Sequence, residues 1–164
     1  VYKVGDYYNR NGKQGVVFYV DSSGRHGKIV SLNRSTSDLE WCSDMDEDDI
    51  NIGASSETDG AYNMQKIKSR PNWRSNYPAA AWCAQLGSDW YLPALDELKT
   101  ILSLKSTLNK TLSKKGVVIE SEWCWSSTES TSDKDCAWSV NMSYGNTYNL
   151  SKYYDVYVRA VSAF

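Results

Sequence analysis

The sequence predicts an α+β fold in which short helices lie around antiparallel sheets. Three observations indicate it: strand patterns occur near the start of the chain, helix patterns fill the middle, and strand patterns return after residue 116. Helices placed between an early hairpin and a late set of strands are typical of this class. The length of 164 residues, with 41% hydrophobic and 13% aromatic residues, suits a single domain over 1–164 with a substantial core.

The opening of the chain predicts a β-hairpin. Residues 15–20 (GVVFYV) and 26–32 (HGKIVSL) form two strand-like runs, and residues 21–24 (DSSG) supply a turn between them. We therefore expect these two runs to pair antiparallel.

Four short helices are predicted in the middle of the chain. They cover 61–69, 78–86, a segment starting at Pro93, and 107–114. Pro78 suits a first helical position, and Gly87 and Gly116 suit the positions that end a helix. The helix after Pro93 carries an apolar stripe of Leu95, Leu98, Ile101 and Leu102. The preceding residues, 90–93 (WYLP), are expected to anchor the core.

Strand patterns return at 117–119, 123–125, 137–142 and 156–161. Between residues 137 and 143 apolar and polar residues alternate strictly. The alternation places Trp138, Val140 and Met142 on one face of a strand and Ser139, Asn141 and Ser143 on the other. We expect the first face to be buried and the second to point away from the core.

The polar positions of this last stretch are the candidate ligand-binding residues. They are Ser139, Asn141, Ser143, Tyr144, Asn146, Tyr148, Asn149, Ser151, Tyr153, Tyr154 and Asp155. Tyrosine offers a large contact area at low entropy cost, while serine and asparagine adapt their hydrogen bonds to a ligand. A wet face of an ordinary antiparallel sheet alternates in the same way, so both interpretations stay open. The concentration of tyrosines favours binding, because an exposed aromatic cluster is unfavourable unless it meets a partner.

Composition excludes several partners. The formal net charge is −2 and no basic stripe is present, so we expect no nucleic-acid partner. No apolar run approaches the ~18 residues of a membrane span, so we expect no direct membrane insertion by this segment. The chain begins with Val1 rather than Met, which leaves room for an upstream targeting segment outside this chain.

No catalytic, metal or cofactor site is predicted. The single histidine, His26, lies in a turn, and no second histidine or nucleophile motif accompanies it. The acidic run 44–49 has Asp49 and Ser55 where a calcium loop needs glycine and glutamate, so a solvated loop is preferred over an irregular calcium site. Asp96 and Glu97 offset a helix dipole.

Four cysteines leave two interpretations open. Cys124 and Cys136 precede strands that pair as a hairpin, so one disulfide joins them and a second joins Cys42 to Cys83; alternatively, all four are buried free thiols. No CxxC pair is present, which argues against zinc.

Several stretches together resemble one family. They are GDYYNRNGKQGVVFYVDSSGRHGKIVSL, YPAAAWCAQLGSDWYLPALDELKTI, CWSSTE, AWSVNM and YVRAVSAF, which span nearly the whole chain. They resemble the DUF1566 family of bacterial surface proteins, common in gut Bacteroidetes and related to the C-terminal domain of a Legionella collagen-like adhesin. The resemblance implies a C-type lectin-like fold, shared with formylglycine-generating enzymes and with the variable proteins of diversity-generating retroelements.

The resemblance also separates framework positions, which hold the fold, from displayed positions, which face a ligand. The implied framework positions are Trp125, Ser126, Ser127, Trp138, Gly145, Arg159 and Phe164. The last ~40 residues would be a variable, ligand-displaying region, in which Leu150 and Val156 join the polar positions given above. Arg159, set between apolar neighbours, is expected to be structural and to need a partner, for which the family frame suggests Glu129.

Three functions follow as hypotheses. The first is a non-catalytic, surface-exposed domain that binds a protein or glycan, diversified by a retroelement. The second is an adhesin or structural surface module of fixed sequence, and the third is an enzyme of the formylglycine-generating kind, which needs reactive cysteines. We expect the first, without a cofactor, at the cell surface or outside the cell, associated with the outer membrane through an upstream segment.

Overall fold

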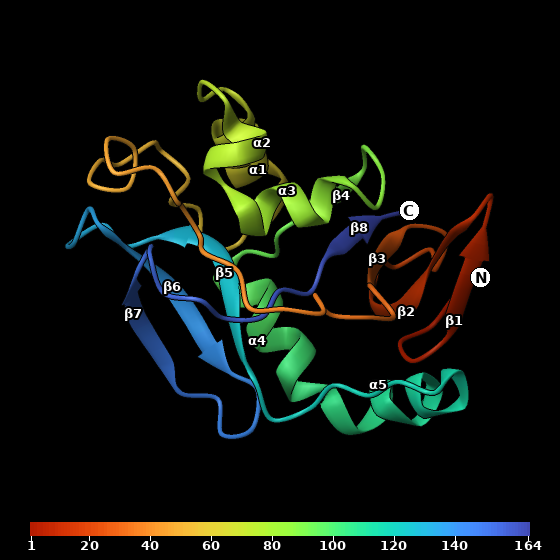
Figure 1. Cartoon of the computed structure of the whole chain (residues 1–164). Helices are drawn as coiled ribbons and strands as arrows, with labels where there is room; N and C mark the ends of the chain where they lie inside the picture. The colour runs from red at the N-terminus through yellow and green to blue at the C-terminus, as the bar shows by residue number, and fades with distance from the viewer.

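Two antiparallel sheets of unequal size organise the chain (Figure 1). The computed structural model describes residues 1–164. The larger sheet has the strand order β1-β2-β3-β8-β4 and the smaller has the order β5-β6-β7. The strands are β1 Tyr7–Arg10, β2 Lys13–Val20, β3 Gly27–Val30, β4 Trp90–Tyr91, β5 Trp123–Glu129, β6 Cys136–Asn141, β7 Thr147–Ser151 and β8 Val161–Ala163.

The larger sheet joins the two ends of the chain. Strands β1 to β3 follow one another as antiparallel hairpins, and β8, from the C-terminus, pairs with both β3 and β4. Figure 1 accordingly places the labels N and C on the same side of the molecule. The predicted hairpin is confirmed as β2 and β3, whereas β1 was not predicted.

The smaller sheet contains the two strands predicted around the late tryptophans. Strand β5 pairs with β6, and β6 pairs with β7, which was not predicted. The predicted strand at 117–119 is wrong. The amide of Asn109 on α5, which donates to the Ile119 carbonyl and accepts from the Ile119 N–H, holds that segment instead of a neighbouring strand. The predicted strand at 156–161 is reduced to isolated bridges at Val156 and Tyr157 and to the short β8.

Five α-helices connect the early and late strands. They are α1 Gly60–Lys68, α2 Trp73–Asn76, α3 Pro78–Ala84, α4 Leu95–Ser103 and α5 Lys105–Leu112, followed by the 3₁₀ turn η1 Ser113–Lys115. The four predicted helices are present with small shifts at their ends, and the single-turn α2 was not predicted. No helix combines the length and the apolar character needed to cross a membrane.

Local chemistry explains where α1 and α4 begin. Asp59 caps α1 by accepting a hydrogen bond from the Tyr62 N–H. Gly60 follows because a Cβ there would lie 2.6 Å from the Glu97 carboxylate and 2.7 Å from the Ala94 nitrogen. Glu97, predicted only to offset a dipole, is buried and accepts hydrogen bonds from Gly60, Ala94, Tyr91 and Lys28. It therefore ties α1, β4 and β3 to the start of α4.

The core lies between the sheets and the helices that face them. Its largest fully buried apolar side chains include Trp41 and Trp125, and the WYLP anchor is buried at Trp90, Tyr91 and Leu92. Trp138 differs from expectation, because it is only half-buried. It lies on β6 directly opposite the exposed Asn149 of the edge strand β7, which leaves part of its ring uncovered.

Candidate functional site

The candidate site lies on β7 and the two segments that flank it. Four tyrosines protrude here: Tyr144 is 85% exposed, Tyr148 51%, Tyr153 42% and Tyr154 58%. Strand β7 occupies the left margin of the molecule in Figure 1, at the outer edge of the smaller sheet. A short turn through Gly145, with φ +80°, joins β6 to β7 and leaves Tyr144 projecting.

The predicted ligand-binding residues fall into three groups by exposure. Exposed residues are Tyr144, Asn146, Tyr148, Asn149, Tyr153, Tyr154 and Asp155. Half-buried residues are Asn141, Ser143 and Ser151. Ser139 alone is fully buried.

Ser139 is therefore a correction to the expected display. It lies on the central strand β6, directly between Trp125 of β5 and Tyr148 of β7. Its hydroxyl donates to the Tyr148 carbonyl at 3.2 Å. The expectation that its face points away from the core is therefore wrong at this position, because Ser139 shares that face with the fully buried Trp125 as well as with the exposed Tyr148.

Asn141 is committed to the turn that follows β6. Its Oδ1 accepts hydrogen bonds from the N–H groups of Ser143 at 2.8 Å and Tyr144 at 3.2 Å. Such a side chain replaces a missing backbone partner and fixes the turn. The residue thus positions Tyr144.

Trp123 adds to this surface and was not predicted to be part of it. The half-buried indole packs edge-on against Tyr148, with ring centroids 5.1 Å apart at 64°. The two residues lie on the same face of the sheet, because Trp123 pairs with Asn141 and Ser139 pairs with Tyr148. Sequence reasoning offered no signal for this, because residues i and i+2 share a face and Trp125 is fully buried.

A buried lysine anchors the middle of the displayed segment. Lys152 is fully buried, and its Nζ donates to the carbonyls of Ile50 and Lys134 at 2.9 Å and to Glu129 at 2.8 Å. The ammonium also lies 4.9 Å from the centre of the Trp41 ring. These contacts satisfy a charge that would otherwise be very costly to bury, and they fix the backbone immediately before Tyr153 and Tyr154.

Glu129 is the counter-ion of this lysine. Besides Lys152, its carboxylate accepts hydrogen bonds from the N–H groups of Ile52 and Ala54 at 2.9–3.1 Å. The expected pairing of Glu129 with Arg159 is thus wrong, because Glu129 faces the 50–54 loop and Lys152.

Arg159 is buried, as expected of a structural residue. Its guanidinium donates to the carbonyls of Ser31, Leu32 and Val118, and its Nε lies 3.7 Å from Glu122. Burial lowers the pKa of Arg159 and raises the pKa of Glu122, while their mutual attraction opposes both shifts. Arg159 thereby links β3, the segment after η1 and the C-terminal strand.

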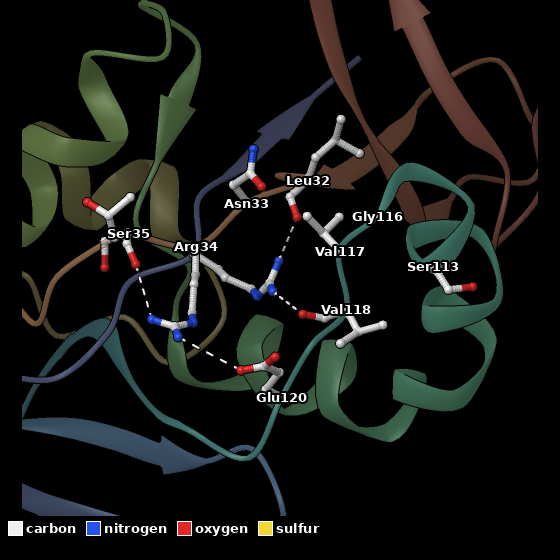
Figure 2. Close-up of a pocket in the computed structure, with 11 residues that line it drawn as sticks. Leu32, Asn33, Arg34, Ser35, Ser113, Gly116, Val117, Val118 and Glu120 are labelled. Atoms are coloured by element: carbon white, nitrogen blue, oxygen red, sulfur yellow. Dashed lines mark hydrogen bonds and ion pairs between the residues drawn. The ribbon is translucent and has the colours of Figure 1, made fainter.

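A cavity of about 490 Å³ lies beside Arg159, between residues 32–36 and 113–120. Figure 2 shows the Arg34 side chain at the margin of this cavity, pointing toward Glu120 and the Ser35 carbonyl. The Arg34 guanidinium also stacks 3.5 Å from the centre of the Tyr157 ring. None of the predicted ligand-binding residues lines this cavity.

The acidic run 44–49 lies beside Tyr153, one of these exposed tyrosines. The neighbouring Asp48 carboxylate raises the pKa of the Tyr153 phenol to about 12, which keeps that hydroxyl protonated. Glu47 turns the other way, toward Arg70 at 2.8 Å and Tyr77 at 2.7 Å.

All four cysteines are free and buried, so the predicted disulfides are absent. Cys124 lies opposite Val140, which is four residues along β6 from Cys136. That separation is roughly 13 Å along a strand, well beyond the ~7 Å limit between Cα atoms for a disulfide. Burial raises the pKa of Cys42 to about 11 and those of Cys124 and Cys136 to about 12.

One group of potential metal ligands occurs on the loop between β5 and β6. Ligand atoms of Asp133, Asp135 and Cys136 lie within 4.8 Å of one another. A cysteine binds metal as its thiolate, and the raised pKa of Cys136 disfavours that form.

The five helices and the antiparallel sheets of five and three strands define an α+β scaffold of the C-type lectin-like class. The family described as the Lcl C-terminal domain, equivalent to DUF1566, matches residues 31–162, and the chain belongs to that family.

A solved structure has the same fold. A fimbrial protein from Bacteroides ovatus ATCC 8483 superposes with a TM-score of 0.72 at 17% sequence identity. The match covers 99% of this chain and 49% of that protein, so this chain spans about half its length. No curated protein sequence matches the chain.

Proposed function

We propose that this chain is a non-catalytic ligand-binding domain displayed at a bacterial cell surface or outside the cell. Its binding face is the tyrosine-rich surface, here defined as Tyr144, Asn146, Tyr148, Asn149, Ser151, Tyr153, Tyr154 and Asp155 with Trp123 beside them. Asn141 and Ser143 support this surface from the turn. The ligand is a protein or a glycan.

One observation carries the proposal. Four of the ten exposed large hydrophobic side chains of the molecule lie within residues 144–154. Exposed aromatic clusters mark interaction sites, and tyrosines contribute much of the binding energy at interfaces. The buried Lys152 and the Asn141 turn hold the backbone between these tyrosines, so the surface is pre-organised.

The test is binding to arrays of glycans and of bacterial surface proteins. Tyr153→Ala and Tyr154→Ala should abolish binding to any array member that the wild-type domain recognises. Tyr19→Ala and Tyr62→Ala are matched controls, because these tyrosines are 49% and 46% exposed but lie away from the surface in question. Equal losses in all four variants would contradict the proposed face.

We further propose that the exposed positions of this segment vary between copies through a diversity-generating retroelement. Side chains that make few buried contacts can change without loss of the frame. The test is the nucleotide sequence around the gene, where a reverse transcriptase and a template repeat differing only at adenines are expected. Their absence favours the second candidate, an adhesin module of fixed sequence, which the family and the fimbrial structure also support.

The cysteines argue against an enzyme of the formylglycine-generating kind. Such chemistry needs an accessible thiolate, and here burial raises the pKa of every thiol. In the native domain we expect a thiol reagent to label the cysteines slowly, with four thiols titrating only after unfolding. Rapid labelling of Cys124 or Cys136 at neutral pH would instead support the enzyme hypothesis.

A further inference from the structure

The outer edge of β7 has no partner strand. β7 pairs with β6 on one side only, and no element lies beyond it at the left margin of Figure 1. An open strand edge presents unpaired N–H and C=O groups that can pair with another chain.

The register shows which backbone groups point outward. Hydrogen bonds from Asn141 N to Asn146 O and from Lys152 N to Asp135 O close the two ends of the β6–β7 ladder. Because bonded and non-bonded pairs alternate in an antiparallel ladder, Tyr148 and Leu150 bond to β6. Thr147 and Asn149 therefore point their backbone groups toward solvent. Ser151 points the same way, but its carbonyl already accepts a hydrogen bond from the Tyr154 N–H at 2.9 Å, so the free edge is centred on Asn149.

Strand β7 lacks the features that usually block edge pairing. Its sequence, TYNLS, contains no charge and no proline, and both are common protections of an edge. The other sheet has less inviting edges: β4 has only two residues, and β1 ends in the exposed Arg10. The other edge of the same sheet, β5, is already bonded on its outer side to Tyr157. The open edge of β7 is thus the best template for strand addition among these edges.

We propose that β7 pairs antiparallel with β7 of a second copy of this chain, about a twofold axis through Asn149. In this register Asn149 opposes its own counterpart, Tyr148 opposes Leu150 of the partner subunit, and Thr147 opposes Ser151 of the partner subunit. Aromatic–aliphatic and hydroxyl–hydroxyl pairs across strands are stabilising, and no like charges meet. The edge is self-complementary, as a twofold interface requires.

Pairing would extend the smaller sheet across two subunits. The order would be β5-β6-β7-β7-β6-β5, and two tyrosine-rich surfaces would lie side by side. This inference goes beyond the proposed function and does not depend on it, because a dimer forms whether or not a ligand binds. Two linked faces would bind a repetitive ligand with greater avidity.

Sedimentation of the intact chain over a wide concentration range tests the proposal. Wild type should show a concentration-dependent dimer. Asn149→Pro removes an outward N–H in each copy, a position where an edge strand tolerates proline, and should weaken the dimer at least about tenfold. Asn149→Thr, a strand former that keeps the N–H, should dimerise like wild type.

A second variant covers the case in which proline disturbs the strand. Asn149→Asp places two carboxylates opposite each other on the axis, so its dimer should be lost at low salt and partly recovered at high salt. Circular dichroism of each variant should match wild type. Two outcomes would overturn the proposal: a wild type that is monomeric at every concentration, or a dimer that neither Asn149→Pro nor Asn149→Asp affects. The first outcome would indicate that a strand of another protein pairs with this edge.

Cysteine cross-linking tests the register. Directly opposed residues in a bonded antiparallel pair have Cα atoms ~5.5 Å apart, within the range of a disulfide. With oxidised glutathione as the oxidant, Asn149→Cys should form a covalent dimer. Thr147→Cys should not, because Thr147 faces Ser151 of the partner subunit. Efficient cross-linking of Thr147→Cys without Asn149→Cys would overturn the twofold register.

Discussion

The frame and the tyrosine-rich surface use polar residues in opposite ways. In the frame, Glu97, Glu129 and Arg159 are buried and each has several hydrogen-bond partners. On the surface, the side chains of Tyr144 and Tyr154 are 85% and 58% exposed. The residues that hold this fold together are thus distinct from those that it presents to solvent.

The ion pair beneath the surface tests this separation most strongly. Glu129→Ala would leave Lys152 charged and unpaired in the core and would remove the acceptor of the Ile52 and Ala54 N–H groups. We expect a loss of about 3–5 kcal/mol in the free energy of unfolding, measured by urea denaturation.

The matched control is an exposed ion pair nearby. Lys134 and Asp49 lie 3.7 Å apart with 62% of each side chain exposed. Lys134→Ala should leave the urea midpoint almost unchanged, because exposed pairs contribute little. Equal effects of the two substitutions would show that Lys152 is not a fixed anchor.

The two late tryptophans sharpen the boundary between frame and surface. Trp125 is fully buried and donates its indole N–H to the Leu39 carbonyl at 2.8 Å, whereas Trp138 is half-buried. Trp125→Ala should cost about 3–5 kcal/mol. Trp138→Ala should cost less, because part of its ring already lies in solvent. If thermal melts show that Trp138→Ala destabilises the domain more than Trp125→Ala does, the boundary between frame and surface is drawn in the wrong place.

Local patterns predicted most of the frame. Apolar runs located β2, β3, β5 and β6, and proline or glycine signals located α1, α3, α4 and α5. The strands that were missed, β1, β4 and β7, all lie at the edge of a sheet. β1 and β7 have polar sequences with little hydrophobic signal, and β4 has only two residues. The error at 117–119 has a tertiary cause, since the amide of Asn109 takes the place of a strand.

The candidate site was predictable in outline but not in its support. Tyrosine composition located the exposed residues, yet alternation could not show that Ser139, between Trp125 and Tyr148 in the sheet, is buried. The pairing of Lys152 with Glu129, and not of Arg159 with Glu129, depends on contacts between segments distant in sequence. Such partners carry no local signal in a single sequence.

A pH-dependent contact lies in the acidic run 44–49, between the frame and the tyrosine-rich surface. Two hydrogen bonds from Arg70 hold the pKa of Glu47 below its usual value of 4.5, and Tyr77 adds a third. A lowered folded-state pKa stabilises the fold above the unfolded pKa, and this stabilisation is lost as the pH falls through the folded value. Glu47→Gln should therefore destabilise by on the order of 1 kcal/mol at pH 7, because solvent near Arg70 screens the pair.

The measurement is the unfolding free energy of wild type and Glu47→Gln between pH 7 and pH 3. The difference between the two proteins should be constant near neutrality and should shrink below about pH 4.5. A difference that grows on acidification would show that the carboxylate does not rely on Arg70.

The smallest expected change in stability comes from the surface itself. Tyr144→Ser and Tyr154→Ser, singly and together, should each shift the free energy of unfolding by under ~0.5 kcal/mol, because exposed substitutions away from caps and cores cost little. Thermal melts followed by near-ultraviolet circular dichroism report both stability and tertiary packing.

Tyr8→Ser supplies the contrast within the same residue type. Tyr8 is 9% exposed, and its ring lies 4.7 Å from that of Phe164 and 5.2 Å from that of Tyr2, so its loss should lower the melting temperature clearly. If the double variant at Tyr144 and Tyr154 unfolds as readily as Tyr8→Ser, then those tyrosines stabilise the fold and selection could not vary them freely. If it melts like wild type while ligand binding is lost, the surface is free to change its specificity on a constant frame, as a diversified binding domain requires.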